Sequence, residues 1–172
     1  MNEADTAAVA AQLGRRPRAL RAVAHRCPCG LPDVVESYPR LDDGTPFPTL
    51  FYLTCPRASA AVSRLEAAGL MRRLTDELSR DPELAAGYAR AHQDYLARRE
   101  ALGHVPEITG ISAGGMPDRV SVRWISVLSR HAEGAASRTL RYDTSRYGSR
   151  TSTCDRNNSS EGIVNRRLSS RR

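Results

Sequence analysis

The hydrophobic positions near the start of the chain fall into three short runs that are rich in β-branched and aromatic residues and are bounded by Pro and Gly. Such runs predict strands, here over residues 19–27, 33–38 and 49–55. A turn signal, Asp-Asp-Gly at 42–44, separates the second run from the third. A short helix over 5–14, with Asp5 as its N-cap and Gly14 as its stop, is expected before them. We therefore expect one small antiparallel sheet of about three strands.

The spacing of apolar residues changes from strand-like to helical after the third run. From Pro56 to Leu102 the chain is rich in Ala, Leu, Arg and Glu. One helix is predicted from Pro56 to a stop at Gly69, a second over 70–79, and a third from a cap at Asp81 to about Leu102. The inner face of the third helix is predicted to hold Leu84, Tyr88, Ala91 or His92, Tyr95 and Leu102. Strands followed by helices are typical of an α+β domain.

Composition divides the chain near residue 120. Residues 1–120 hold 15 Arg and 15 acidic residues, whereas residues 121–172 hold 11 Arg against 4 acidic residues and so supply the whole net charge of +7. Serine rises from 5 in the first 120 residues to 11 in the last 52. We expect an α+β domain over 1–120 and a disordered C-terminal tail over 121–172, because so polar a segment cannot bury enough surface to fold. The tail makes nucleic-acid binding an alternative function, although a solvated tail without a role is the more favoured interpretation.

Other features narrow the class of protein. All basic residues are arginine, which is best explained by a high-GC genome. No run of residues approaches the about 20 apolar positions that span a bilayer, and the N-terminus runs from acidic to basic, the reverse of a secretory signal. The Gly-rich segment 107–120 lacks the spacing and the lysine of a phosphate loop. A cytoplasmic location without membrane association is expected, with cysteines reduced or bound to metal.

Three of the four cysteines fall at strand ends, and each has a proline beside it. Cys27 and Cys29 flank a turn after the first strand, and Cys55 joins the third strand to a helix. If the first and third strands are neighbours, the three thiols converge, with His25 as a fourth metal ligand for zinc or an iron–sulfur cluster. The alternative is a thiol enzyme or redox protein centred on Cys55, with His25 or His104 as base. Buried cysteines that act only as small hydrophobic residues remain the simpler interpretation.

Four motifs in order, "HRCPCGLPDVV", "GTPFPTLFYLTCP", "LEAAGLM" and "GISAGGMPDRV", give the chain a family resemblance. Over residues 12–120 it resembles an uncharacterised bacterial family, domain of unknown function 501. The resemblance implies no activity, substrate or partner. It does imply that Cys27, Cys55 and the "GISAGG" loop matter in the family.

Members of that family continue after this loop with a Lys-Cys-Leu-His motif, where this chain reads "SVRWISVLSRHAEG". The resemblance implies a family ligand set of three cysteines and a histidine drawn from three motifs, which suits zinc or an iron–sulfur cluster. Neither His131 nor Cys154 stands at the family spacing. The departure coincides with the break in composition, so we expect residues 121–172 to be out-of-frame translation.

Overall fold

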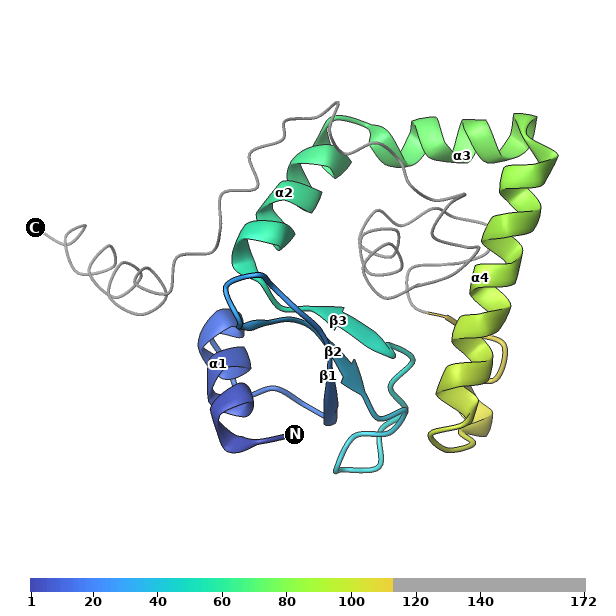
Figure 1. The fold of residues 1–172 in the computed structure, drawn as a ribbon. Coiled ribbons are helices and arrows are strands. Elements are labelled where there is room, and N and C mark those ends of the chain that lie inside the picture. Colours follow the sequence, from blue (N-terminus) through green and yellow to red (C-terminus); the bar gives the residue numbers. More distant parts are fainter. Residues whose placement is uncertain (113–172) are drawn as a thin grey trace, which may run out of the picture.

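The computed structural model describes residues 1–112, in which a three-stranded antiparallel sheet is followed by helices (Figure 1). The predicted α+β order is confirmed. The predicted disorder of the tail lies outside the described residues. The elements are α1 (Glu3–Leu13), β1 (Leu20–Arg26), β2 (Pro32–Ser37), β3 (Phe51–Leu53), α2 (Pro56–Ala67), α3 (Leu70–Arg80), α4 (Pro82–Glu100) and a 3₁₀ turn, η1 (Pro106–Ile108).

The sheet is a meander with β2 at its centre, in the order β1-β2-β3. β2 is almost entirely buried although half of its residues are polar, and Val34 and Val35 are at most 1% exposed. β1 pairs with β2 through register shifts on either side of His25, so regular alternation is lost there. Because both pairings are antiparallel, the end of β1 and the end of β3 lie beside the start of β2.

The two faces of the sheet are covered by different helices. Phe51 and Leu53 alternate with Tyr52 along β3, so Tyr52 points to the opposite face. On the first face the ring of Phe51 meets that of Tyr95 from α4 edge to face, with centroids 6.5 Å apart. Val35, the cross-strand partner of Tyr52, shares the second face, and α1 packs against β2.

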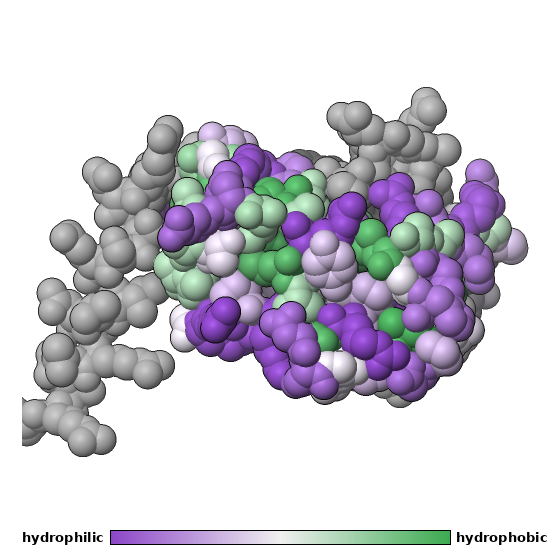
Figure 2. Space-filling model, turned by 90° about the horizontal axis from the view of Figure 1, so that it is seen from below, coloured by the Kyte–Doolittle hydropathy of each residue, from purple (hydrophilic) through white to green (hydrophobic). Residues whose placement is uncertain are grey.

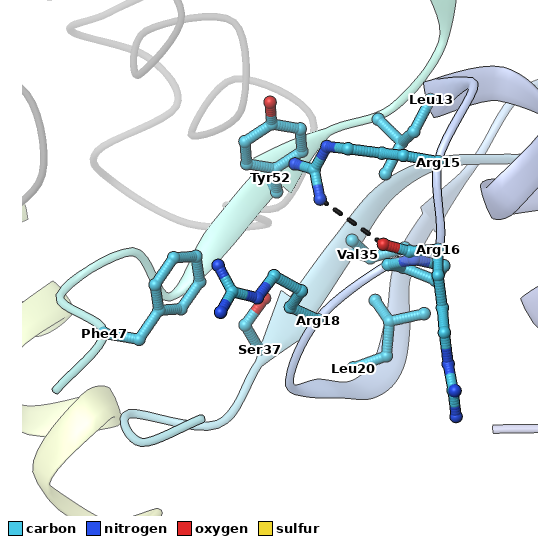
Figure 3. Close-up of a pocket in the computed structure, with 10 residues that line it drawn as sticks. Leu13, Arg15, Arg16, Arg18, Leu20, Val35, Ser37, Phe47 and Tyr52 are labelled. Carbon is cyan, nitrogen blue, oxygen red and sulfur yellow. Dashed lines mark hydrogen bonds between the residues drawn. The ribbon is translucent and has the colours of Figure 1, made fainter. Parts of the chain in front are cut away.

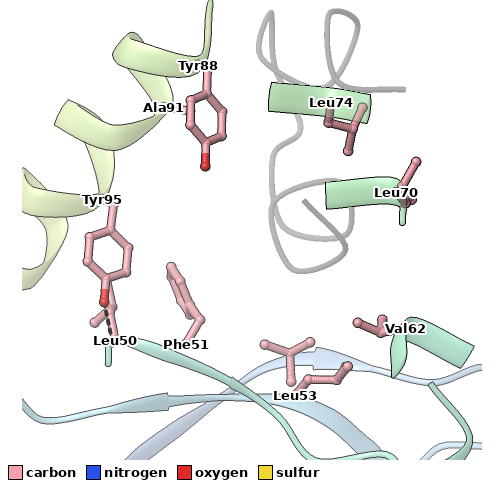
Figure 4. Close-up of a cluster of buried hydrophobic side chains, with 10 residues drawn as sticks. Leu50, Phe51, Leu53, Val62, Leu70, Leu74, Tyr88, Ala91 and Tyr95 are labelled. Atoms are coloured by element: carbon pink, nitrogen blue, oxygen red, sulfur yellow. Dashed lines mark hydrogen bonds between the residues drawn. The ribbon is translucent and has the colours of Figure 1, made fainter. Parts of the chain in front are cut away.

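The core cluster joins the first face of the sheet to all three later helices (Figure 4). Its buried members are Val34, Leu50, Phe51, Leu53, Val62, Leu70, Leu74, Tyr88, Ala91 and Tyr95. The predicted inner face of α4 is confirmed, since Tyr88, Ala91, His92 and Tyr95 are each less than 5% exposed. Side chains of this size contribute about 1.5–3 kcal/mol each when fully buried, so the cluster fixes how the helices meet the sheet.

Capping explains most of the helix boundaries. Asp81 accepts hydrogen bonds from two backbone N–H groups at the start of α4, and the left-handed Gly69 (φ 79°) separates α2 from α3, both as predicted. Gly14 ends α1 in the left-handed conformation, which is also confirmed. The prediction that Asp5 caps α1 is wrong. Asn2 is the cap, and its Oδ1 accepts a hydrogen bond from the N–H of Asp5 at 2.7 Å.

Asp5 instead ties α1 to β1. Both of its carboxylate oxygens accept hydrogen bonds from Arg26, at 2.6 and 2.8 Å. The Arg26 guanidinium, mainly through these hydrogen bonds, holds the pKa of Asp5 below its usual value of 3.8. The pair therefore anchors α1 to the sheet only while the carboxylate is ionised.

A buried arginine on α4, absent from the predictions, holds the segment that follows. Arg99 is 3% exposed and donates hydrogen bonds to the carbonyls of Ile108, Ile111 and Pro48. Through Arg99, the start of the "GISAGG" loop at Ile111 is linked by hydrogen bonds to α4 and to the segment that leads into β3.

The face seen from below is largely polar, with hydrophobic residues in small separate patches (Figure 2). Among residues 1–112 the large hydrophobic side chains that are exposed are Met1, Tyr38 and Ile111. None of the helices in the described part of the chain has the length and hydropathy needed to cross a bilayer.

Candidate functional site

The cysteine end of the sheet, as we call residues 25–32 with 53–55, contains the residues predicted to bind metal. After β1, the backbone turns through Cys27 and Cys29, and Gly30 N–H donates to the Cys27 carbonyl at 2.8 Å. Gly30 has a φ of 87°, which favours glycine at this corner. Both cysteines are half-buried. The predicted turn between two thiols is therefore present.

Cys55 lies at the same end of the sheet but on the far side of the central strand. It directly precedes α2, is 5% exposed, and makes no side-chain cap hydrogen bond. The predicted convergence required the first and third strands to be neighbours, and they are not, because β2 separates them. Two strand spacings of about 4.8 Å put the β1 and β3 backbones roughly 10 Å apart. Cys55 is thus set apart from the turn that holds Cys27 and Cys29.

His25 is oriented by a buried carboxylate. Its Nδ1 lies 2.6 Å from Oδ1 of Asp33, whose side chain is only 1% exposed, whereas that of His25 is 31% exposed. An ionised carboxylate accepts the proton on Nδ1, which leaves Nε2 as the nitrogen with a lone pair. The same arrangement occurs behind histidines that bind metals and histidines that act as bases. Sequence analysis did not identify Asp33 as the partner.

The other chemistry-bearing residues are dispersed. His104 pairs with Glu100 on the surface, far along the chain from Cys55, and His92 is buried in α4. Within residues 1–112, no three His, Cys, Asp or Glu side chains are gathered as metal ligands would be. The metal site at His25, Cys27, Cys29 and Cys55 stays a prediction, as does thiol chemistry at Cys55. His131 and Cys154 lie outside the described residues.

A pocket of about 330 Å³ opens on the second face of the sheet, at the end opposite the cysteines (Figure 3). We call it the arginine pocket. Its walls come from the end of α1, the loop after it, all three strands and the segment before β3. The lining residues are Leu13, Arg15, Arg16, Pro17, Arg18, Leu20, Val35, Ser37, Phe47 and Tyr52.

Local sequence explains how the arginines reach this pocket. Gly14 ends α1 in the left-handed conformation, and Pro17 restricts the backbone of the loop that leads to β1. The arginines of this loop therefore lie at the pocket. The guanidinium groups of Arg15 and Arg18 point toward the side of the pocket that holds the rings of Tyr52 and Phe47 (Figure 3). Arg16 runs the other way. Arg15 donates a long hydrogen bond, 3.4 Å, to the Arg16 carbonyl.

The charge of the pocket is unbalanced, because none of its lining residues is acidic. Elsewhere in residues 1–112 several arginines meet a carboxylate, among them Arg26 with Asp5 and Arg40 with Glu107. No carboxylate in that range pairs with Arg15 or Arg16. Such a cluster of cations without counter-charges in a concave site is typical of a place where an anion binds.

Arg18 has one acidic neighbour outside the pocket. Asp43 lies in the turn before β3, and its Oδ2 is 3.4 Å from a terminal guanidinium nitrogen of Arg18. Both side chains are more than half exposed. Hydrogen bonds from Thr45, and less strongly the charge of Arg18, hold the pKa of Asp43 below its usual range. An exposed pair of this length is weak, so Arg18 can exchange Asp43 for another anion.

Sequence analysis missed this pocket. Its signal was the "RRPR" run at 15–18, directly after a predicted helix stop. The all-arginine composition hides this run, and the rest of the lining is spread between residues 13 and 52, which only the fold of the sheet brings together.

Comparison with known proteins identifies a family. Residues 23–128, more than half of the chain, match the family described as "Protein of unknown function (DUF501)". The match includes the cysteine motifs and extends past residue 120, where the resemblance noted from the sequence stops. No curated protein and no solved structure matches the chain.

Proposed function

We propose that this chain, which belongs to the DUF501 family of proteins of unknown function, is a binding protein for a small anionic molecule held in the arginine pocket. The single observation that carries the proposal is the lining itself, three arginines and no acidic residue around about 330 Å³. That volume lies at the lower end of the range for small-molecule sites.

The distribution of charge supports a compact ligand rather than a polyanion. Residues 1–112 contain 14 Arg and 14 acidic residues, so this part of the chain has no net charge. A nucleic acid would need a continuous basic surface to neutralise successive phosphates. Three arginines within four residues, surrounded by a neutral domain, suit one small charged group instead. Guanidinium groups recognise phosphate and carboxylate through paired hydrogen bonds.

Inorganic phosphate is the simplest probe of the proposal. We expect millimolar binding by isothermal titration calorimetry, weakening as ionic strength rises. Arg15→Gln with Arg18→Gln should reduce the affinity at least 10-fold, because each charge-assisted hydrogen bond contributes about 1.5–3 kcal/mol. Arg72→Gln with Arg90→Gln, an equal change of charge at exposed positions of α3 and α4, is the matched control and should leave the affinity unchanged. Equal losses in both variants would show that only net charge matters and would refute a specific pocket.

Asp43 provides a second test with its own control. Asp43→Asn removes the carboxylate that competes for Arg18, so phosphate should bind up to about 5-fold more tightly. Asp42→Asn changes the same charge one residue earlier, at an exposed position. If the two variants bind phosphate equally well, Arg18 does not take part in binding.

A second candidate function keeps the predicted metal site, and the His25 geometry favours it. A histidine that binds zinc commonly donates its other ring N–H to a carboxylate, as His25 does toward Asp33. Cys27 and Cys29 follow in the next turn, so these three residues are the ligands we propose for zinc or an iron–sulfur cluster. They are not gathered as ligands within residues 1–112 of the structure, so the proposal requires the turn to draw them together when the metal binds. Cys55, which lies beyond β2, is a less suitable fourth ligand.

Metal analysis of protein purified with and without air tests this candidate. We expect about one zinc per chain, or more than one iron for an iron–sulfur cluster, and less than a tenth of that amount after Cys27→Ser with Cys29→Ser. Cys55→Ser should keep the metal if the ligands are those of the turn. Metal-free protein under both conditions, with thiols that all react with a maleimide, would exclude the site in this chain.

A further inference from the structure

We infer that the ligand of the arginine pocket is a phosphate monoester of a single flat ring, an inference that rests on the anion-binding function proposed above. The pocket combines two kinds of surface that a simple inorganic anion would not use together. One is cationic, and the other is aromatic and apolar.

The aromatic surface faces the same space as the charges. Tyr52 from β3 and Phe47 from the preceding segment both line the pocket and are half-buried. In Figure 3 the guanidinium group of Arg15 points toward the ring of Tyr52, and that of Arg18 points toward the ring of Phe47. A bound ring can therefore contact an aromatic face while its charged substituent reaches the arginines. Aromatic faces bind planar rings through stacking and edge contacts, in addition to the area they remove from water.

The base of the pocket between these rings is aliphatic. Leu20 and Val35 line it from β1 and β2, and Leu13 lines it from the end of α1. An apolar base favours an unsubstituted ring over a sugar or another polyhydroxylated group, whose hydroxyls would lose their hydrogen bonds to water. About 330 Å³ is room for one ring with a small charged group rather than for a dinucleotide.

The number of charges selects phosphate over carboxylate. Two guanidinium groups, those of Arg15 and Arg18, are directed into the pocket, and no lining carboxylate offsets either of them. A phosphate monoester carries close to two negative charges at neutral pH and offers three acceptor oxygens, enough for both groups. A carboxylate offers one charge and two acceptor oxygens, and would leave Arg18 with only its weak, exposed pair with Asp43 while Arg15 is neutralised.

Calorimetric titration of the full chain with phenyl phosphate, cyclohexyl phosphate, benzoate and inorganic phosphate tests the inference. Phenyl phosphate should bind at least 10-fold more tightly than inorganic phosphate and more tightly than its cyclohexyl and carboxylate counterparts. Phe47→Leu and Tyr52→Leu, which keep an apolar side chain and remove the ring, should each weaken phenyl phosphate about 5- to 10-fold. They should weaken inorganic phosphate clearly less than phenyl phosphate, and a far-UV circular dichroism spectrum like that of the unmodified chain shows that they fold. Tyr38→Leu, at an exposed tyrosine outside the pocket, is the control.

The outcomes separate the two proposals. If phenyl phosphate and inorganic phosphate bind equally and both need Arg15 and Arg18, the inference is overturned while anion binding stands. If phenyl phosphate binds more tightly but is insensitive to Phe47→Leu and Tyr52→Leu, ring recognition in this pocket is also overturned. If benzoate binds as tightly as phenyl phosphate, the choice of phosphate is wrong. Absence of binding by all four probes would overturn both the inference and the function on which it rests.

Discussion

Replacing Tyr95 with phenylalanine removes a single oxygen atom from the centre of the fold and should be one of the most costly small changes in the chain. The Tyr95 side chain is 1% exposed. Its hydroxyl accepts a hydrogen bond from the Leu50 N–H at 2.7 Å and donates one to the Pro48 carbonyl. It thereby joins α4 to the segment that enters β3.

The size of the loss in stability depends on which hydrogen bonds Leu50 and Pro48 keep when the Tyr95 hydroxyl is removed. Leu50 is 1% exposed, and its N–H loses the acceptor it has in the structure, a loss that costs about 1–3 kcal/mol. The Pro48 carbonyl keeps a hydrogen bond from Arg99 at 3.3 Å, so its loss is smaller, about 0.5–1 kcal/mol. Phenylalanine fills the same volume and keeps the edge contact with Phe51, so no cavity term is added. We expect Tyr95→Phe to lower the free energy of unfolding by about 1.5–4 kcal/mol in total.

Urea unfolding followed by far-UV circular dichroism measures the difference. The midpoint should fall while the slope with denaturant stays the same, since the change alters stability and not the exposed area. Tyr38→Phe is the matched control, because Tyr38 is 47% exposed, and it should change the free energy of unfolding by less than about 0.5 kcal/mol. Equal effects of the two substitutions would refute the role assigned to the Tyr95 hydroxyl.

Three further predictions concern the ends of the helices. Asp81→Ala should destabilise by about 1 kcal/mol in urea unfolding, because Oδ1 caps two N–H groups, and a loss no larger than that of exposed Asp76→Ala would contradict this. Asp5→Asn should lower the free energy of unfolding by about 1 kcal/mol at pH 7, because the ion pair with Arg26 is lost. That deficit should begin to shrink as the pH falls below 3.8 and should vanish once the wild-type carboxylate is protonated, below its lowered pKa. A deficit that persists in stronger acid would exclude the Arg26 pair as its cause. Gly69→Ala should cost about 1 kcal/mol and Gly69→Asn less, since φ is 79° and a Cβ meets nothing within 4 Å; equal losses would argue against backbone strain.

Local signals were sufficient for the elements and their order. The β-branched runs, the change to helical spacing after Pro56, and the stops at Gly14 and Gly69 act within a few residues, and the structure follows them closely. The N-cap of α1 was misplaced because Asn2 and Asp5 are both good capping residues, and the choice depends on a long-range partner. The Asp5 carboxylate accepts hydrogen bonds from Arg26 of β1, and the side chain of Asn2 caps the helix instead.

Arg99 shows why burial could not be read from local pattern. An arginine in the last turn of a helix is expected in solvent, where it interacts with the helix dipole. Here three carbonyls, from Pro48, Ile108 and Ile111, converge on its guanidinium and compensate the loss of hydration. Two of those carbonyls come from a segment with no recognisable element in the sequence, so the acceptor set had no signature.

The position of β2 decides which chemistry the fold can assemble. With β2 in the centre, the start of β1 and the end of β2 meet at one end of the sheet, where Leu20 pairs with Ser37 beside the arginine pocket. The opposite end receives Cys27 from one edge strand and Cys55 from the other, so two strand spacings separate thiols that the sequence alone suggested could meet. A site at the cysteine end must therefore be built within the β1–β2 turn, where Asp33 already fixes the ring of His25. A site at the pocket end draws on all three strands and on the loop after α1. That breadth is what allows it to combine cationic, aromatic and aliphatic surfaces around one ligand.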